Sequence, residues 1–292
     1  MTQRKSPRSL ARQAQPKRSE AKVVDAPANW VESAASREFL EIPPLASAPL
    51  IADPAQEEAR QAIRLADTIF IAPTGYGKSW VAYAAAGDAL EAAGRVYYTT
   101  PLKALSNQKF VDLSERFGPE RVGLITGDRR ENPSAAIVVL TTEILRAMLL
   151  AGDALAPADS PCLIVLDEWH WLADPERGTT WEEVILLAPR SARLLLLSAS
   201  VGNGDQIAEW LEEVRGHQPR LLMVETRAVP QRWGVWHNGT ILPLGEAIAR
   251  NVASGLSPAW PAVVEVLKRD GLTPALVFLP TRRACDALAN QC

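Results

Sequence analysis

The stretch Ala72-Pro73-Thr74-Gly75-Tyr76-Gly77-Lys78-Ser79 follows a short apolar run and precedes a helical pattern. Its two glycines let the backbone approach a ligand and turn N–H groups inward, and the N-terminus of the following helix adds partial positive charge. Lys78 is suited to the β- and γ-phosphates of a nucleotide, and the Ser79 hydroxyl to Mg²⁺. Residues 72–79 are therefore predicted to form an ATP-binding phosphate loop, although the strict pattern begins with Gly where this chain has Ala72.

A second stretch, Leu163-Ile164-Val165-Leu166-Asp167-Glu168-Trp169-His170, is an apolar run that ends in two carboxylates. Carboxylates at the end of a buried strand are costly unless they meet a cation or a ligand. We expect Asp167 to bind Mg²⁺, directly or through water, and Glu168 to orient and deprotonate an attacking water. His170 is expected to link the nucleotide site to a nucleic-acid site. The alternatives are an acidic pair that caps the next helix and a structural histidine.

Ser198-Ala199-Ser200 closes another apolar run. The hydroxyls of Ser198 and Ser200 are suited to relaying hydrogen bonds from the phosphate site, and a simple turn or helix N-cap is the alternative. These residues are predicted to couple the two sites.

Along the rest of the chain, short apolar runs alternate with segments of helical periodicity, such as residues 142–150 and 205–214. Several runs are apolar at nearly every position, as expected of strands covered on both faces. This rhythm predicts an α/β fold with a doubly wound, mostly parallel sheet, whose ligands bind beyond the carboxyl ends of the strands. The predicted strands are Thr68–Ala72, Val96–Thr100, Val122–Thr126, Ile137–Thr141, Cys162–Asp167, Leu194–Ser198 and Leu221–Glu225.

Three regions are predicted along the chain. Residues 1–55 are basic and rich in Pro, Ser and Ala, and are expected to be disordered. Residues 56–226 form the ATP-binding domain. Residues 227–292 are expected to hold a linker at 227–240, a helix at 261–269, and one strand–helix unit, with the strand at 275–279 and the helix at 281–290, as the incomplete start of a second α/β domain.

Composition narrows the class of protein. The chain has 292 residues, 47% of them hydrophobic, and three cysteines without C-x-x-C spacing, which excludes a disulfide framework or zinc site and fits a cytoplasmic location. No apolar run reaches membrane-spanning length, so no membrane partner is expected. The net charge is −3 although residues 1–19 hold six cations and no acid, so the remaining chain would bind nucleic acid only through a local groove.

Seven segments taken in order, APTGYGKS, TTPLKALSNQK, GLITGD, TTEILRAML, DEWH, RGTTWEE and LSAS, resemble superfamily-two DExH-box helicases. The resemblance is greatest to the superkiller-type RNA helicases that feed the RNA exosome and to their bacterial relatives. It covers residues 56–226 densely and implies a RecA-like ATP-binding domain. It further implies ATP and Mg²⁺ as cofactors, and a single-stranded nucleic acid, RNA rather than DNA, as partner. The RNA-degradation machinery is implied as a second partner.

The resemblance also implies roles for individual residues. Gln56 stands where a glutamine that reads adenine is expected, and the RGTTWEE segment is expected to pack a helix behind the acidic motif. The residues implied in nucleic-acid contacts are Pro101, Lys103, Asn107, Gln108, Gly127, Asp128, Thr141, Thr142 and Glu143.

The chain departs from the family pattern in several places. Ser79 and Ser200 replace the commoner threonine, and Trp169 stands where a smaller residue is usual, so its bulk is expected to alter the site. Residues 227–292 contain no arginine-rich Q-x-x-G-R-x-G-R-like motif. Loss of such an arginine costs about 10³–10⁵ in rate.

We therefore expect an ATP-dependent RNA helicase, in a truncated form with little turnover alone. Two alternatives remain at this stage: a non-catalytic, nucleotide-gated RNA-binding fragment, and a DNA helicase or translocase of the same superfamily.

Overall fold

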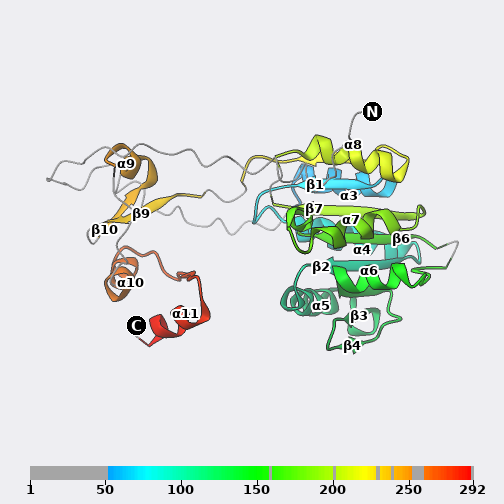
Figure 1. Ribbon diagram of the computed structural model, residues 1–292, viewed down its shortest axis with the longest axis horizontal. Coiled ribbons are helices and arrows are strands. Elements are labelled where there is room, and N and C mark those ends of the chain that lie inside the picture. Colours follow the sequence, from blue (N-terminus) through cyan, green and yellow to red (C-terminus); the bar gives the residue numbers. More distant parts are fainter. Residues whose placement is uncertain are drawn as a thin grey trace. The chain divides into compact units, whose positions relative to one another are not determined.

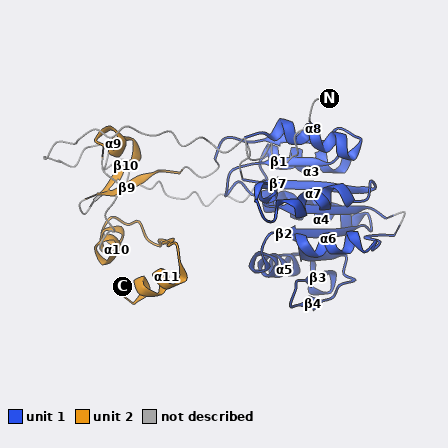
Figure 2. Cartoon of the chain, in the orientation of Figure 1, with its two compact units in different colours: residues 1–17, 50–229 blue, residues 18–49, 230–292 orange. Residues whose placement is uncertain are grey.

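The computed structural model describes residues 52–157, 160–199, 202–227, 231–237, 240–251 and 260–290. The chain divides into two compact units, and the described residues of the first end at 227 while those of the second begin at 231 (Figure 2). The region predicted to be disordered lies almost entirely outside the described residues, as does Ser200. The predicted domain boundaries stay predictions.

The first unit is built on one eight-stranded sheet in the order β4-β3-β5-β2-β6-β7-β1-β8 (Figure 1). Each pair of neighbours is parallel except β3 and β4, so the predicted doubly wound, mostly parallel sheet is confirmed. The strands are β1 (Thr68–Ile71), β2 (Arg95–Thr100), β3 (Val122–Ile125), β4 (Arg130–Glu131), β5 (Ile137–Thr141), β6 (Cys162–Asp167), β7 (Ala192–Ser198) and β8 (Arg220–Met223).

The seven strands predicted between residues 68 and 225 all form, with ends that differ by at most two residues from those expected. Their runs are apolar throughout because both faces of the sheet are covered, and the inner strands are buried at almost every position. In the described part of this sheet, the two-residue strand β4 was not predicted, since so short and exposed a segment carries no apolar signal. Strands β1 and β6 are separated by β7 alone, so their carboxyl ends lie about 10 Å apart at one rim.

Six α-helices cover the two faces of the sheet (Figure 1). Helices α3 (Pro54–Leu65), α4 (Lys78–Glu91) and α5 (Lys103–Phe117) pack on one face. Helices α6 (Thr142–Leu150), α7 (Gly178–Leu187) and α8 (Gly204–Arg215) pack on the other, together with a short 3-10 turn at Trp169–Ala173. Trp169 is buried in this second core layer, so its bulk is directed into the core, contrary to the expectation that it would alter the site.

A buried ion pair holds three elements of the first unit together. Asp67, which precedes β1, and Arg215, the last residue of α8, are both almost fully buried, and Arg215 Nε donates to Asp67 Oδ2 over 2.8 Å. The other Asp67 oxygen accepts the backbone N–H of Leu194 in β7 at 2.9 Å. Arg215 also donates to three backbone carbonyls, those of Ala188, Pro189 and Ala192. The pair is therefore well satisfied, as a buried charge must be.

The second unit begins with an antiparallel hairpin of β9 (Gly234–His237) and β10 (Thr240–Pro243), followed by α9 (Leu244–Ala249). The prediction of a linker at 227–240 was therefore wrong in part. Ile241 pairs with Trp236 and Leu242 with Val235. Cross-strand pairs of apolar side chains such as these stabilise a hairpin. Strands as short as β9 and β10 leave no long apolar run in the sequence.

Two further helices of the second unit were predicted, α10 (Trp260–Arg269) and α11 (Arg282–Ala289), and both form. The Thr281 side chain caps α11 by accepting the N–H of Ala284. The predicted strand at 275–279 was wrong: no described segment pairs with it, and Leu276 and Phe278 are each 87% exposed. An apolar run becomes a strand only where a neighbour accepts its backbone hydrogen bonds. In the parts of the chain that are described, none of the helices is suited by length and apolarity to span a bilayer.

Candidate functional site

The predicted phosphate loop joins the end of β1 to the start of α4, which is the strand–loop–helix context that such a loop requires. Gly75 and Gly77 have left-handed backbone angles, with φ of 84° and 88°. A Cβ atom on Gly77 would also lie 2.3 Å from the side-chain nitrogen of Gln56. Gly77 is therefore required for its backbone angle, and a larger residue would also displace the end of the Gln56 side chain.

Lys78 is the first residue of α4, and its ammonium group is drawn back over the loop. The Nζ atom donates to the carbonyl oxygen of Ala72 at 2.8 Å and to that of Pro73 at 3.3 Å. Burial lowers the pKa of Lys78, while the carboxylates of Glu168 and Asp167 act in the opposite direction. The lysine that is expected to meet phosphates is thus already close to both carboxylates of the acidic pair.

Asp167 ends β6 and is almost fully buried. Tyr98 of β2 donates its hydroxyl to one carboxylate oxygen at 2.7 Å, and the Glu168 N–H donates to the other at 3.0 Å. Burial raises the pKa of Asp167, and the hydrogen bond from Tyr98 partly offsets this rise. Because a bound cation would favour the ionised form, the carboxylate is poised for a metal ion or an ammonium group.

Glu168 has a left-handed backbone, with φ 55° and ψ 40°, which is unusual for a residue with a side chain. Strained backbone of this kind is found mostly at functional sites. The Glu168 carboxylate lies 3.2 Å from His170 Nδ1, and the same nitrogen lies 3.4 Å from the Ser198 hydroxyl at the end of β7. The contact with His170 is the main cause that lowers the pKa of Glu168. Three of the predicted site residues are therefore in contact.

Lys78, Asp167 and Glu168 line one hollow of about 350 Å³ at the carboxyl rim of the sheet. The phosphate loop and the acidic pair form part of its lining, and α5 forms the rest. The lining residues are Thr74, Gly75, Gly77, Lys78, Ser79, Leu105, Gln108, Lys109, Asp167 and Glu168.

Three residues of α5, Leu105, Gln108 and Lys109, lie in this lining, and none was assigned to the nucleotide from the sequence. Gln108 was predicted to contact nucleic acid, yet it lines the hollow. Lys109 was missed altogether, although it closes the quoted segment TTPLKALSNQK. Its spacing supplied no usable signal, since Leu105, which lies four residues before it on the same face of the helix, was not assigned to the site either. Lys109 Nζ donates to the Ser79 hydroxyl at 2.7 Å.

Gln56 lies against the backbone of the phosphate loop. Its side-chain nitrogen donates to the Tyr76 carbonyl oxygen at 2.6 Å, and its side-chain oxygen accepts the Asp53 N–H in a capping box that begins α3. The Tyr76 hydroxyl donates to the Asp53 carboxylate, and burial together with this bond raises the pKa of Tyr76 to about 12. Gln56 thus fixes the loop; adenine recognition by Gln56 stays a prediction.

The residues predicted to contact nucleic acid lie at the carboxyl ends of β2, β3 and β5, the same rim as the hollow. Lys103 Nζ lies 3.2 Å from the Asp128 carboxylate, in the loop that includes Gly127. Arg129 donates to the Asn107 side chain and so ties the same loop to α5.

Arg177 joins the other predicted segments at this rim. It donates to the Pro101 carbonyl oxygen at 2.6 Å and to Glu143 at 3.0 Å, and its guanidinium lies 5.1 Å from the centre of the Trp171 ring. Trp171 is the residue directly after His170, the last residue of the acidic motif. Thr141 and Thr142 stand at the junction of β5 and α6, and Thr142 is fully buried, so that Glu143 is the more accessible of the three.

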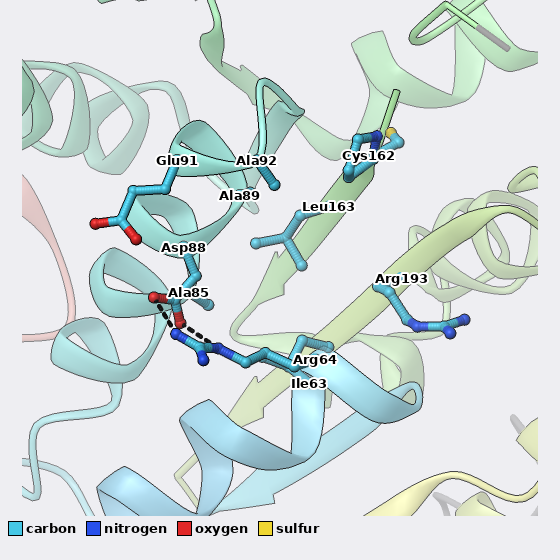
Figure 3. Close-up of a pocket in the computed structure, with 11 residues that line it drawn as sticks. Ile63, Arg64, Ala85, Asp88, Ala89, Glu91, Ala92, Cys162, Leu163 and Arg193 are labelled. Carbon is cyan, nitrogen blue, oxygen red and sulfur yellow. Dashed lines mark hydrogen bonds and ion pairs between the residues drawn. The ribbon is translucent and has the colours of Figure 1, made fainter. Parts of the chain in front are cut away.

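A second hollow, of about 520 Å³, lies at the opposite rim of the sheet (Figure 3). It is bordered by the first residue of β6, Cys162, and by Arg193 near the start of β7, with Arg64 and Asp88 ion-paired at its edge. None of the predicted site residues lines it, and its lining is mainly apolar. Among the described residues, the predicted phosphate-binding side chains therefore line the hollow at the carboxyl rim and not this one.

A doubly wound parallel sheet whose first strand leads into a glycine-containing loop with Lys78, facing an acidic pair two strands away, defines a P-loop nucleotide-binding domain. Residues 53–207 match the model of the DEAD/DEAH box helicase family, and the chain belongs to this family.

Individual relatives agree with this assignment. The probable helicase HelY of Mycobacterium leprae is 35% identical over 291 aligned residues, which cover 85% of this chain and 31% of that protein. The chloroplastic DExH-box ATP-dependent RNA helicase DExH15 of Arabidopsis thaliana is 42% identical over 199 residues, covering 67% of this chain and 17% of that protein. The antiviral helicase SKI2 of Saccharomyces cerevisiae is 37% identical over 203 residues, covering 69% of this chain and 16% of that protein. The chain thus spans at most about a third of the length of these relatives.

Proposed function

We propose that this chain carries the ATP-binding domain of an ATP-dependent RNA helicase, in which ATP hydrolysis drives movement on, or unwinding of, RNA. The observation that supports this most is the convergence of Lys78, Ser79, Asp167 and Glu168 on one hollow at the carboxyl rim of the sheet. Membership of the DEAD/DEAH box helicase family supports the reaction class.

The donor set of the hollow fits Mg²⁺ and a nucleotide triphosphate. A hydroxyl and a carboxylate are the hard oxygen ligands that Mg²⁺ prefers, so Ser79 and Asp167 would hold it. When bound, Mg²⁺ would neutralise charge on the β- and γ-phosphates. Lys78 would exchange its two carbonyl acceptors for phosphate oxygens, which are better partners for a cation because the resulting hydrogen bonds are charge-assisted on both sides.

Glu168 would act as the general base on water. Its lowered pKa keeps the carboxylate ionised at neutral pH and hence able to accept a proton. The contact with His170, and through it with Ser198, gives the base a connection that reaches the end of β7. We propose that this connection couples the nucleotide state to the nucleic-acid segments, with Ser200 as a further member.

Single-stranded RNA is the proposed polymer, bound through the segments that carry Lys103, Asn107, Asp128 and Glu143. Their location at the same rim as the hollow supports coupling of the two sites. One relative supports RNA over DNA, because the Arabidopsis protein is named an RNA helicase. Competition between matched single-stranded RNA and DNA of one length would separate these substrates, and a preference for DNA would favour the translocase alternative.

The RNA-degradation machinery is the proposed partner, and the cytoplasm the proposed location, both by resemblance to the superkiller-type helicases. Whether the chain turns ATP over by itself separates a motor from a nucleotide-gated binding module. Steady-state ATP hydrolysis, measured with and without RNA, makes this distinction, since strong stimulation by RNA would exclude the non-catalytic module.

Replacing Lys78 with Ala is expected to weaken Mg·ATP binding by about 10- to 100-fold, because charge-assisted hydrogen bonds to phosphate are lost. The measurement is calorimetric titration of Mg·ATP into the two proteins. Lys268→Ala, which removes an exposed lysine of the second unit, is the matched control and should bind as the wild type does. Equal affinities for the wild type and Lys78→Ala would reject the proposed nucleotide site.

A further inference from the structure

Lys109 occupies a position in the hollow that the proposed function does not assign. It lies on α5, and its ammonium group donates to the Ser79 hydroxyl at 2.7 Å and to the Tyr83 hydroxyl at 3.3 Å. The ammonium also lies 5.3 Å from the centre of the Tyr83 ring and 5.8 Å from that of Tyr98. Two aromatic faces therefore hold the cation in place, as such rings do for ammonium groups.

The partners of Lys109 are all uncharged. In the described part of the chain, no carboxylate oxygen lies within 4.0 Å of its Nζ atom. The side chain is half-buried, and a partly desolvated ammonium without an anion is costly. Its field acts on Asp167 and Glu168 without direct contact with either. The Lys109 ammonium would therefore stabilise an anion that entered the hollow.

The contact with Ser79 has a consequence for the loaded state. Ser79 is the hydroxyl proposed for Mg²⁺, and a cation already sits beside it. Two cations do not share one hydroxyl oxygen at these distances without strong repulsion. If Mg²⁺ binds the Ser79 hydroxyl, the Lys109 ammonium must move away from it. The rings of Tyr83 and Tyr98, and the position of Lys109 on α5, keep the ammonium within the same hollow.

We propose that Lys109 is a second cationic ligand of the nucleotide, which binds the terminal phosphate from α5 while Lys78 binds from the phosphate loop. This inference rests on the proposed function and deepens it. The hollow contains two lysines and two carboxylates, so its own charges cancel before a ligand arrives. A triphosphate with one Mg²⁺ remains negative overall, and the terminal phosphate carries the largest share of that charge. Lys109 is the lysine with no carbonyl acceptor to give up.

A contact between Lys109 and the terminal phosphate would affect the affinity for ATP but not that for ADP, because only ATP has this phosphate. We expect Lys109→Gln to bind a Mg²⁺-loaded β,γ-imido analogue of ATP about 10-fold more weakly or worse, with Mg·ADP affinity little changed. Lys109→Arg, which keeps the charge, should recover part of the loss. Affinities are measured by calorimetry for the whole chain, with Arg121→Gln as a control that removes an exposed cation from outside the hollow.

Three results would overturn this role. Equal losses for both nucleotides would mean that Lys109 only supports the fold of the site, and unchanged affinities would mean that it is a bystander. Tighter binding of the ATP analogue by Lys109→Gln would mean that the ammonium competes with Mg²⁺ for Ser79. A wild-type chain that bound neither nucleotide would instead contradict the proposed function itself, so the two failures are distinguishable. The ADP measurement also reports whether Lys109→Gln is folded.

Discussion

Glu168→Gln lowers the rate of ATP hydrolysis by about 10²–10⁴-fold in our account, while Mg·ATP stays bound. The amide keeps the size of the side chain but cannot accept the proton of an attacking water. Glu168 lines the hollow with Lys78 and Ser79, and it contacts His170 rather than any residue of the phosphate loop. The loop should therefore hold nucleotide as before. Single-turnover hydrolysis with protein in excess, together with calorimetric affinity, measures both parts of this prediction.

The matched control for this prediction is Glu120→Gln, which makes the same chemical change at an exposed site paired only with Arg121. It should hydrolyse ATP at the wild-type rate. If Glu168→Gln retained that rate as well, Glu168 would not be the base. If it lost nucleotide affinity in proportion to rate, the carboxylate would serve binding instead of proton transfer.

Arg215→Met should reduce the free energy of unfolding of the first unit by about 3–5 kcal/mol. The change removes the guanidinium from the buried Asp67 carboxylate, beside which His217 Nε2 remains at 3.1 Å, and it leaves three backbone carbonyls without the donors they have now. Methionine fills most of the space, so loss of packing contributes little. The expected fall in melting temperature is about 10 °C. Urea unfolding followed by tryptophan fluorescence measures the free energy.

The control for the buried pair is Arg121→Met, which breaks an exposed pair and should change stability by less than about 1 kcal/mol. The double variant, with Asp67→Ala added to Arg215→Met, should lose less than the two single variants together, because it no longer buries an unpaired charge. Additive losses would mean that Asp67 and Arg215 are stabilised by separate neighbours and do not act as a pair.

The sheet was predictable from the sequence because its inner strands are covered on both faces. Runs such as Ile137–Thr141 and Cys162–Asp167 are apolar or small at nearly every position. The runs are also too short to be typical helices, so their length favours strands. The helical stretches at 142–150 and 205–214 were predictable because each buries one stripe against the sheet. Local pattern and global architecture agree here, so the ends of the strands matched closely.

The features that escaped prediction depend on which segments or side chains pair with one another, and composition does not specify those pairs. The run at 275–279 has strand composition but no strand beside it among the described residues, and composition alone cannot supply one. The hairpin of β9 and β10 depends on which side chains face each other across the two strands. Asp67 and Arg215 are 148 residues apart, and a charged residue in either place gives no sign in the sequence that it is buried with the other.

The candidate site follows the same division. The phosphate loop and the acidic pair could be predicted because each is a contiguous stretch with a known chemical use, and parallel strands bring their carboxyl ends to one rim. Lys109 could not be assigned in this way, since its place in the hollow depends on how α5 lies across the sheet. The closeness of Gln56 to Gly77 likewise arises from the packing of α3 behind the loop. Ser200 lies outside the described residues, so its coupling role stays a prediction.

Crystals of the chain grown with Mn²⁺ and the β,γ-imido analogue of ATP would decide where the nucleotide binds, because Mn²⁺ is visible by its anomalous scattering. We predict one strong peak beside the Ser79 hydroxyl and the Asp167 carboxylate, with the terminal phosphate next to the ammonium group of Lys78. A nucleotide bound at the other rim, beside Cys162 and Arg193, or a metal ion that touches neither Ser79 nor Asp167, would contradict the site proposed here.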